Sequence, residues 1–306
     1  MGDLRGTMSS KALDLFAATM TKRYQVSNLV DMKPAEFRQA INDLLNLRDA
    51  SMEGYKDADK QRDLSIRYHW GHNHDFGDFS LQGRMGNRHV SIPAQFADQF
   101  KALPTDLMGK KILDIGVWTG GTSLLFSALG AEVVAVEEVK KYADTVEFLK
   151  KAFGLKGLKV LNCSLYELNR DDLYDQFDYV FFSGVIYHVT DPIIALRIVF
   201  NCLKDGGTCL LESTAIPDKR RLFGEKDKLV SYEGPGKVWS GAKEDLSRGG
   251  WDWFVPSPSA VKQMMIDVGF ENIEVGPIEE TRVMAVGHRT KHCDILRAGL
   301  SVRNIR

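Results

Sequence analysis

One short stretch of the sequence combines residue types that suit the binding of a polar ligand. In LDIGVWTGG, residues 113–121, Asp114, Gly116 and Gly120 give the spacing D-x-G-x-x-x-G. Glycines let the backbone turn sharply and approach a ligand closely. The carboxylate can accept hydrogen bonds from the loop itself or from an ammonium group of a ligand. Glu137 ends the next apolar run, where an acid commonly holds the two hydroxyls of a ribose.

A second stretch, FFSGVIYHVTDP at residues 181–192, places Tyr187 and His188 directly after an apolar run and a Ser-Gly step. A histidine at such a place can act as a general base, or it can be a polar wall that is hydrogen-bonded to backbone. Both interpretations of His188 stay open at this point, and Tyr187 could either orient an acceptor or line a pocket. Ser183 and Gly184 allow the backbone to approach a bound cofactor closely.

These two stretches need a scaffold, and the chain from about residue 110 to residue 290 has the pattern of one. Short apolar runs alternate with segments of helical spacing, and glycines end several of them. Apolar strands that alternate with helices predict a parallel sheet covered on both faces, and right-handed crossovers then impose a doubly wound, Rossmann-like order. We therefore expect an α/β fold with a seven-stranded sheet whose last two strands are antiparallel. The expected strands are KKILDIG, AEVVAVE, LKVLNCSL, FDYVFFSG, TCLLEST, ENIEVGPI and RVMAVGHR.

Three regions are expected along the chain. Residues 1–62 form an N-terminal helical extension, because ALDLFAATMTKRY and PAEFRQAINDLLNL place apolar residues at helical spacing. Residues 63–109 form an entry segment rich in aromatic residues and histidine, and its residues 63–98 have no helical period and predict loops with one or two short strands. Residues 110–306 form the cofactor-binding domain. It contains a polar, glycine-rich insertion at about 216–256 that we interpret as a lid.

Bulk composition argues against several classes of protein. The chain has 306 residues, of which 44% are hydrophobic and 26% charged, and its formal net charge of -1 provides no global attraction for nucleic acid. The 4 cysteines form no C-x-x-C pair, which argues against a zinc site and fits a reduced, cytoplasmic setting. No secretory signal and no membrane span are expected, since no apolar run approaches about 18 residues.

The loop at Asp114 favours one class of cofactor. A dinucleotide would need the spacing G-x-G-x-x-G, so that its pyrophosphate could rest on the helix N-terminus. That pattern is absent, and Trp118 and Thr119 crowd the loop. A bulky loop suits a ligand without phosphates, and S-adenosylmethionine (SAM) is such a ligand, with an ammonium group that Asp114 would attract. We therefore expect SAM as the cofactor.

With these residues in hand, residues 110–290 or so resemble the class I SAM-dependent methyltransferases. Within that superfamily the chain is similar to the branch of the tRNA wobble-uridine carboxymethyltransferase. LDIGVWTGGTSLLFSALGAEVVAVE resembles motif I and the acidic strand end of that branch, and FFSGVIYHVTDPIIAL resembles its GVLYHLRDP signature. WDWFVPSPSAVKQMMIDVGF resembles its segment W-x-x-P-x-x-x-x-L-x-x-M-L-x-x-A-G-F. Upstream, YHWGHNHDFGDFSLQGR is similar to the aromatic segment that folds over the cofactor in the branch.

The resemblance implies that SAM lies across the carboxyl ends of the strands. Glu137 would hold the ribose, and Asp114 would lie near the methionyl end. Ser164 and Leu165 would flank the adenine. Trp70 resembles the branch aromatic that packs on the donor, and its alternative role is that of a core aromatic under the N-terminal helices. The expected cofactor contacts are Trp70, Asp114, Gly116, Trp118, Gly120, Glu137, Ser164, Leu165, Ser183 and Gly184.

The acceptor would enter beneath the lid, and the sequence offers several residues for it. Methyl transfer from a sulfonium needs mainly alignment of the acceptor, plus a base where the acceptor atom is protonated. Glu212 at the end of the fifth strand could anchor a cationic acceptor or simply hold a loop. The histidines and Asp75 of the aromatic segment have no partner cluster of recognisable ligand spacing, so no metal is expected. The expected catalytic residues are Tyr187 and His188, and the expected acceptor contacts are His72, Tyr187, His188, Glu212, Trp251 and Asp252.

Two departures from the branch bear on the reaction. The branch enzyme holds the extra carboxylate of its donor with basic residues, but the aromatic segment here offers Gly71, His72 and His74 and no lysine. Val189 stands where an arginine would follow the Tyr-His pair. The first hypothesis is therefore methyl transfer from SAM to an O, N or S atom of a small molecule. The second is a tRNA-modifying enzyme that acts on a wobble uridine, which is not favoured, and the third is a catalytically inactive SAM-binding subunit. The apolar N-terminal helices could also form a homodimer.

Overall fold

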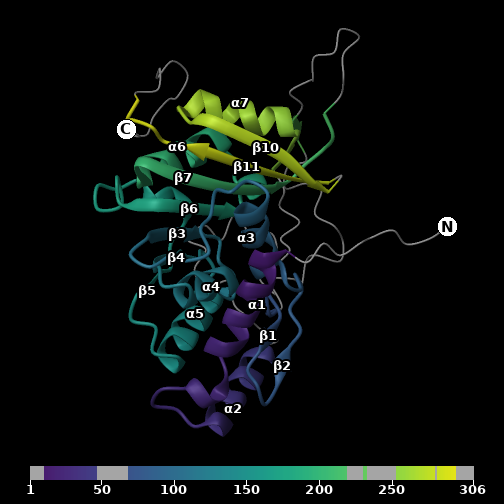
Figure 1. Ribbon diagram of the computed structural model, residues 1–306, viewed down its shortest axis with the longest axis vertical. Helices are drawn as coiled ribbons and strands as arrows, with labels where there is room; N and C mark the ends of the chain where they lie inside the picture. The colour runs from purple at the N-terminus through teal and green to yellow at the C-terminus, as the bar shows by residue number, and fades with distance from the viewer. Residues whose placement is uncertain (1–9, 47–67, 219–229, 233–252, 280, 294–306) are drawn as a thin grey trace, which may run out of the picture.

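A seven-stranded sheet forms the centre of the structure, a computed structural model that describes residues 10–46, 68–218, 230–232, 253–279 and 281–293 (Figure 1). The strand order is β10-β11-β7-β6-β3-β4-β5. Strands β3 to β7 pair in parallel, and β11 is antiparallel to both β7 and β10. The predicted α/β sheet and its antiparallel pair are thus confirmed. The strand bounds are β3 Lys111–Ile115, β4 Glu132–Val136, β5 Leu158–Leu161, β6 Phe177–Ser183, β7 Leu203–Thr214, β10 Glu271–Glu279 and β11 Arg282–His288.

The sheet separates two hydrophobic cores, because successive side chains of a strand point to opposite faces. Ile112 and Phe181 belong to the core that also contains side chains of the helices α1, α3, α4 and α5. Their neighbours Leu113 and Phe182 belong to the core formed with α6 and α7. Helices therefore cover both faces, as a doubly wound fold requires. The helices introduced here are α1 Lys11–Arg23, α3 Arg88–Asp98, α4 Gly121–Ala128, α5 Lys140–Ala152, α6 Pro192–Cys202 and α7 Pro258–Val268.

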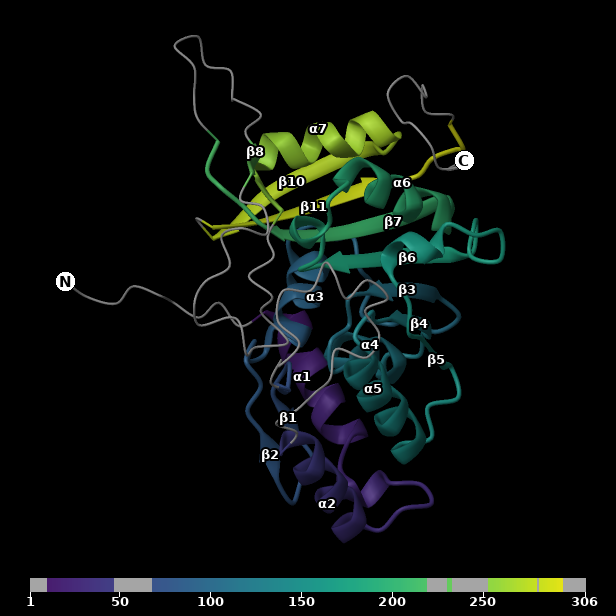
Figure 2. The ribbon, with the colours of Figure 1, turned by 180° about the vertical axis from the view of Figure 1, so that it is seen from behind.

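The N-terminal helices pack into the first of these cores. Ser10 caps α1 by accepting a hydrogen bond from the Leu13 amide, and Tyr24 just after α1 donates its hydroxyl to the Leu124 carbonyl at 2.7 Å. The helix α2, Pro34–Leu45, adds Phe37, which is wholly buried. Figures 1 and 2 show α2 and α7 at opposite ends of the molecule. The helical prediction is confirmed for these segments, and its remainder up to residue 62 lies outside the described residues.

The aromatic region contains a helix that the sequence pattern did not predict. The two short strands β1, His74–Asp75, and β2, Ser80–Leu81, match the expectation, but α3 follows them as a helix of 11 residues. The polar residues Arg88, Ser91, Gln95 and Asp98 recur at helical spacing along the less buried side of this helix, but the glycines and histidines just before it hide the period. Pro93 inside the helix also has the appearance of a break, because proline lacks the amide hydrogen that would complete the helical ladder.

The end of α6 also differs from the prediction. The segment PIIALRIVFNCLKDGG was expected to stay helical up to its glycine pair, but the helix ends at Cys202 and β7 begins at the next residue. Arg289, just after β11, also binds this end, where the Asp175 and Gln176 amides already donate to the carbonyl groups of Asn201 and Cys202. The Nη1 atom of Arg289 donates to the carbonyl oxygens of Phe200, Asn201 and Leu203 at 3.3, 3.2 and 2.7 Å.

The expected lid is described only in part. The strands β8, Val230–Tyr232, and β9, Phe254–Pro256, pair with each other in antiparallel fashion, although no strand was predicted there. After β9 the helix α7 begins at Ser257, whose hydroxyl accepts from the Ala260 amide, and ends at Gly269 with φ +107°. Both caps agree with the sequence prediction. Among the described residues, no helix has the length and apolar character needed to cross a membrane.

Candidate cofactor and acceptor site

The two chemistry-bearing stretches meet at the carboxyl ends of β3 and β6. Gly116, Trp118 and Gly120 all have positive φ angles of 75°, 54° and 82°, so the loop from β3 to α4 is tightly coiled. A Cβ atom on Gly116 would lie 2.4 Å from the Cγ2 atom of Val185 in the loop after β6. This close approach explains the glycine and places the loop of Tyr187 directly beside the predicted cofactor loop.

Asp114 at the end of β3 holds the first turn of α4. Its Oδ2 accepts hydrogen bonds from the hydroxyls of Thr122 and Ser123, both at 2.6 Å. Burial raises the pKa of Asp114 to about 6, although both hydroxyl bonds act in the opposite direction. The carboxyl group therefore has a structural function in this state, and its contact with a donor ammonium group stays a prediction.

Glu137 directly follows β4 and faces the same loop. Its two carboxylate oxygens accept from the backbone amides of Trp118 at 2.8 Å and Val139 at 2.9 Å. Burial raises the pKa of Glu137 to about 7 in spite of these bonds. An acid at a strand end beside a glycine loop has the position that a ribose contact requires. The role itself stays a prediction.

The residues expected beside an adenine lie at the carboxyl end of the edge strand β5. Ser164 caps the short helix η3, Leu165–Leu168, and its amide donates to the Glu167 carboxylate at 2.9 Å. Leu165 is buried in the second core. The cofactor loop, Glu137 and Ser164 thus follow three neighbouring parallel strands, β3, β4 and β5, at one edge of the sheet. This is the edge at which open α/β sheets bind their ligands.

The aromatic segment is fastened to the cofactor loop. The Gly71 amide donates to the Thr119 hydroxyl at 3.0 Å, and the Trp118 indole donates to the His69 carbonyl at 3.2 Å. Trp70 lies in the first core with 3% exposure, and its indole donates to His74 Nδ1 at 3.1 Å. Trp70 therefore has the surroundings of a core aromatic, and its contact with a cofactor stays a prediction.

Three imidazole rings cluster behind this segment. The rings of His72 and His74 lie 5.1 and 5.5 Å from the ring of His89 on α3. Burial lowers the pKa values of His72, His74 and His89 to about 3, 4 and 2, so all three are neutral near pH 7. Within the described part of the chain, no group of three or more His, Cys, Asp or Glu side chains is arranged to hold a metal ion.

Tyr187 and His188 lie on the short helix η4, Ile186–His188, between β6 and α6. Their ring centroids are 4.2 Å apart, and His188 is exposed while Tyr187 is half-buried. The Trp253 amide donates to the Tyr187 carbonyl at 2.7 Å, which joins the start of β9 to this loop. Val189, where the related branch has an arginine, is buried in the second core. The other two expected acceptor contacts, Trp251 and Asp252, lie outside the described residues.

Glu212 near the end of β7 has partners that sequence reasoning missed. The side chain is wholly buried, and its Oε1 accepts from Arg88 Nη2 at 2.7 Å and from Arg282 Nε at 2.5 Å. The Ser183 hydroxyl donates to its Oε2 at 2.9 Å. The Arg282 guanidinium also lies 5.6 Å from the centroid of the Tyr187 ring. The sequence did contain a signal for Arg282. A strand that pairs with β7 in antiparallel fashion begins beside the end of β7, and Arg282 is the first residue of that strand.

The part of the chain that carries this site also matches a known protein family. Residues 88–275, more than half of the sequence, match the family described as the methyltransferase domain. The chain belongs to this methyltransferase family. The predicted class of enzyme is thereby confirmed for the domain, and with it the expectation of SAM as the cofactor.

Curated relatives match this chain over part of their length. A tRNA U34 carboxymethyltransferase from Desulfotalea psychrophila is 32% identical over 177 residues, which are 57% of this chain and 49% of that protein. A tRNA U34 carboxymethyltransferase from Hydrogenovibrio crunogenus is 26% identical over 182 residues, 58% of this chain and 50% of that protein. These similarities confirm the resemblance that the motifs indicate. The chain spans about half the length of the curated relatives it matches.

A solved structure extends the likeness beyond the methyltransferase domain. The N-terminal domain of EvdMO1, crystallised in the presence of SAH and D-fucose, covers 86% of this chain and 99% of its own, with a TM-score of 0.56 and 17% sequence identity. At a sequence identity of 17%, this likeness shows only that the two chains share a fold.

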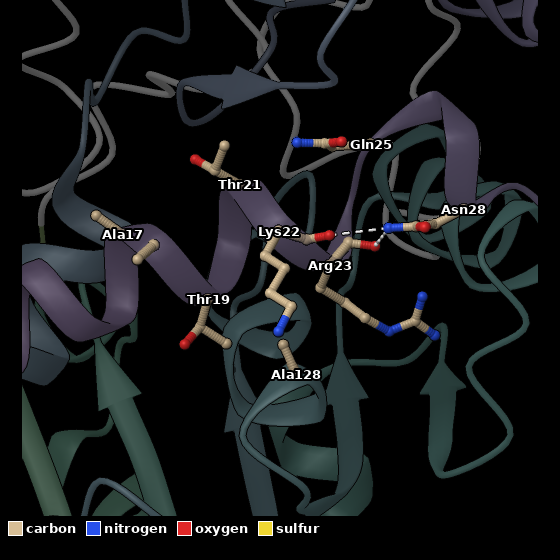
Figure 3. Close-up of a pocket in the computed structure, with 9 residues that line it drawn as sticks. Ala17, Thr19, Thr21, Lys22, Arg23, Gln25, Asn28 and Ala128 are labelled. Carbon is tan, nitrogen blue, oxygen red and sulfur yellow. Dashed lines mark hydrogen bonds between the residues drawn. The ribbon is translucent and has the colours of Figure 1, made fainter.

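A hollow on the helical side of this methyltransferase lies apart from the site (Figure 3). It is lined mainly by residues of α1 and by Ala128 at the end of α4, whereas the cofactor loop precedes the beginning of α4. Its charged lining residues are Lys22 and Arg23, and Arg23 donates to the Phe153 carbonyl at 2.9 Å. None of the described residues of the lining is an acid or a histidine that could serve as a general base.

Proposed function

We propose that the protein transfers the methyl group of SAM to an O, N or S atom of a small molecule. One observation carries the choice of a small acceptor. The polar groups beside Tyr187 are enclosed, with the Glu212 side chain 1% and the Arg282 side chain 14% exposed. An acceptor group that reaches them must leave bulk water, which suits a small polar molecule. The formal net charge of -1 also offers no general attraction for the phosphates of an RNA.

In this proposal the donor lies across the carboxyl ends of β3, β4 and β5. SAM supplies a sulfonium whose methyl carbon is already activated, so the protein has mainly to align the acceptor with it. Glu137 would accept the ribose hydroxyls, and Ser164 with Leu165 would flank the adenine. Gly116 lets the cofactor loop pack closely against Val185, so a donor bound at these strand ends would lie next to the loop of Tyr187. His188 would take a proton only from an acceptor that is protonated near pH 7.

A second candidate function is carboxymethyl transfer to a tRNA wobble uridine. The curated relatives carry that activity in their names, and Arg282 places a cation beside Tyr187 that the sequence pattern did not reveal. Other features speak against it. Val189 is buried where the branch has an arginine, and burial lowers the pKa of His72 to about 3, so that the aromatic segment offers no cation at that position. No observation favours the third hypothesis, an inactive subunit.

A labelled-donor experiment separates these functions. The full chain is incubated with SAM carrying a deuterated methyl group and with a metabolite extract or bulk tRNA, and products are identified by mass spectrometry. We expect a labelled small molecule and no labelled nucleoside. Binding to tRNA that weakens steeply with salt, together with a carboxymethylated uridine made from the carboxylated donor, would establish the second function instead. Binding of S-adenosylhomocysteine (SAH) without turnover of any extract would indicate an inactive subunit.

A further inference from the structure

A buried carboxylate near the end of β7 is held between two arginines that come from distant parts of the chain. Glu212 accepts from Arg88, the first residue of α3, and from Arg282, the first residue of β11. The Ser183 hydroxyl at the end of β6 occupies its other oxygen. We call these four residues the Glu212 cluster. Both oxygens of Glu212 are thus already engaged by the protein, so the carboxylate is poorly placed to serve as the anchor of a cationic acceptor.

The Glu212 cluster carries more positive than negative charge. Arginine stays protonated in proteins, so two guanidinium groups and one carboxylate leave an excess of one positive charge. Burial opposes the charged form of Arg282, but its contacts with Tyr187 and Glu212 outweigh this and raise its pKa. Arg282, whose side chain is 14% exposed, would by itself neutralise Glu212, and Arg88, 30% exposed, then leaves a positive charge that no other member of the cluster compensates. The ion pair alone therefore does not explain both arginines.

The position of Arg88 adds to this excess. Helix N-termini carry a partial positive charge, so a cation in the first turn is unfavourable for the helix and an acid is preferred there. Arg88 is nevertheless the first residue of α3, a helix of 11 residues with no acidic residue in its first turn. Its side chain is 30% exposed, so its guanidinium is also accessible to a solute. The two guanidinium groups meet at Glu212 Oε1, so they would attract a negative group to one place.

The Glu212 cluster adjoins the acceptor side of the site. The Arg282 guanidinium lies 5.6 Å from the Tyr187 ring centroid, and the Tyr187 hydroxyl lies 3.6 Å from the position of a Cβ atom on Gly184. The amide of Gly184 donates to the Glu212 carbonyl at 2.9 Å. Val185, the next residue, contacts the cofactor loop at Gly116. A group bound to the arginines would therefore lie beside the loop that we assign to the acceptor.

We propose that the methyl acceptor carries an anionic group, a carboxylate or a phosphate, that binds Arg88 and Arg282. The proposal rests on the proposed function, because it assigns the class of its small-molecule acceptor. A guanidinium offers a planar fork of donors that matches both anions, and Glu212 holds the two forks in place. In this arrangement Glu212 is a positioning residue, and the anion of the acceptor compensates the excess positive charge.

Calorimetric titration of small anions tests the proposal before the acceptor is known. The full chain is saturated with SAH and titrated with inorganic phosphate or with acetate, and chloride keeps the ionic strength constant. We expect one of the two probes to bind saturably. Its dissociation constant should rise about tenfold or more in Arg282→Gln and in Arg88→Gln, because each variant loses a charge-assisted hydrogen bond to the anion. Arg38→Gln is the matched control, since Arg38 is an exposed arginine on α2 and should leave binding unchanged.

The outcomes are distinct. SAH affinity shows whether each variant is folded, and Arg282→Lys, which keeps the charge, should retain part of the anion binding if Arg282→Gln does not fold. Absence of saturable anion binding in the wild type, or equal dissociation constants in Arg88→Gln and Arg38→Gln, overturns the proposal while the proposed function stands. Failure of the wild type to bind SAH contradicts the proposed function itself. If Arg282→Gln weakens binding of a carboxylated SAM but not of phosphate or acetate, the arginines bind the donor, which also overturns the assignment.

Discussion

Gly116 allows a quantitative test of the contact between the two loops of the site. In Gly116→Ala the new methyl group would lie 2.4 Å from the Cγ2 atom of Val185, and the alanine would have to adopt the φ of 75° that Gly116 has. The left-handed conformation costs an alanine about 1 to 2 kcal/mol, and overpacking adds about 1 to 3 kcal/mol. We therefore expect the free energy of unfolding to fall by about 2 to 5 kcal/mol. The affinity for SAH should also fall, because Val185 or the loop must move.

Two further variants separate these contributions. Gly109 has a φ of 73° and no atom within 4 Å of an added Cβ, so Gly109→Ala should show the conformational cost alone, about 1 to 2 kcal/mol. Val185→Ala removes the clashing methyl group. In the double variant with Gly116→Ala the two losses should therefore be non-additive by about 1 to 3 kcal/mol.

Urea denaturation followed by circular dichroism gives these values, provided that the denaturant slopes of the variants agree. Calorimetry with SAH reports the state of the cofactor loop in the same proteins. The reasoning is refuted if Gly116→Ala costs no more than Gly109→Ala, or if the effects of Gly116→Ala and Val185→Ala add.

The remaining predictions concern single residues of the site. Burial raises the pKa of Glu137 to about 7, and the ionised form is the better acceptor for ribose hydroxyls, so SAH affinity should increase as the pH rises through about 7. Calorimetry should show this increase in the wild type, and its persistence in Glu137→Gln would exclude the assignment. Trp70→Phe removes the indole bond to His74 and should lower the free energy of unfolding by about 1 kcal/mol. A large loss of SAH affinity in this variant would instead show that Trp70 contacts the donor. His188 is exposed, so His188→Ala should retain most of the turnover of an identified acceptor, whereas a loss of about a hundredfold or more would establish it as the base.

Local signals in the sequence predicted helix ends and turns correctly where a residue acts on its own neighbours along the chain. Ser257 and Gly269 mark the two ends of α7, because a hydroxyl cap and a left-handed glycine each act within one helical turn. Gly116 and Gly120 mark the coiled loop after β3 for the same reason, since positive φ is a property of a single residue.

The sequence pattern gave a wrong prediction for the end of α6 and for α3. At the end of α6, Arg289 and the Gln176 amide, both distant in sequence from this helix end, donate to its carbonyl groups, which the local sequence does not indicate. The helix α3 was missed although Arg88, Ser91, Gln95 and Asp98 recur at helical spacing, because Pro93 inside it has the appearance of a break.

The sequence by itself determined the alternation of strands and helices, the glycine loop and the acid after β4, because these depend on hydrophobic period and on the conformational freedom of single residues. The tertiary structure alone decided which charges meet. Arg88 and Arg282 are nearly two hundred positions apart, and only the order of the strands and the packing of α3 bring both to Glu212. The physical reason is that a guanidinium acts over a few ångströms of space, whatever its separation along the chain. The charge beside Tyr187, from which the acceptor class is inferred, is therefore a product of the fold.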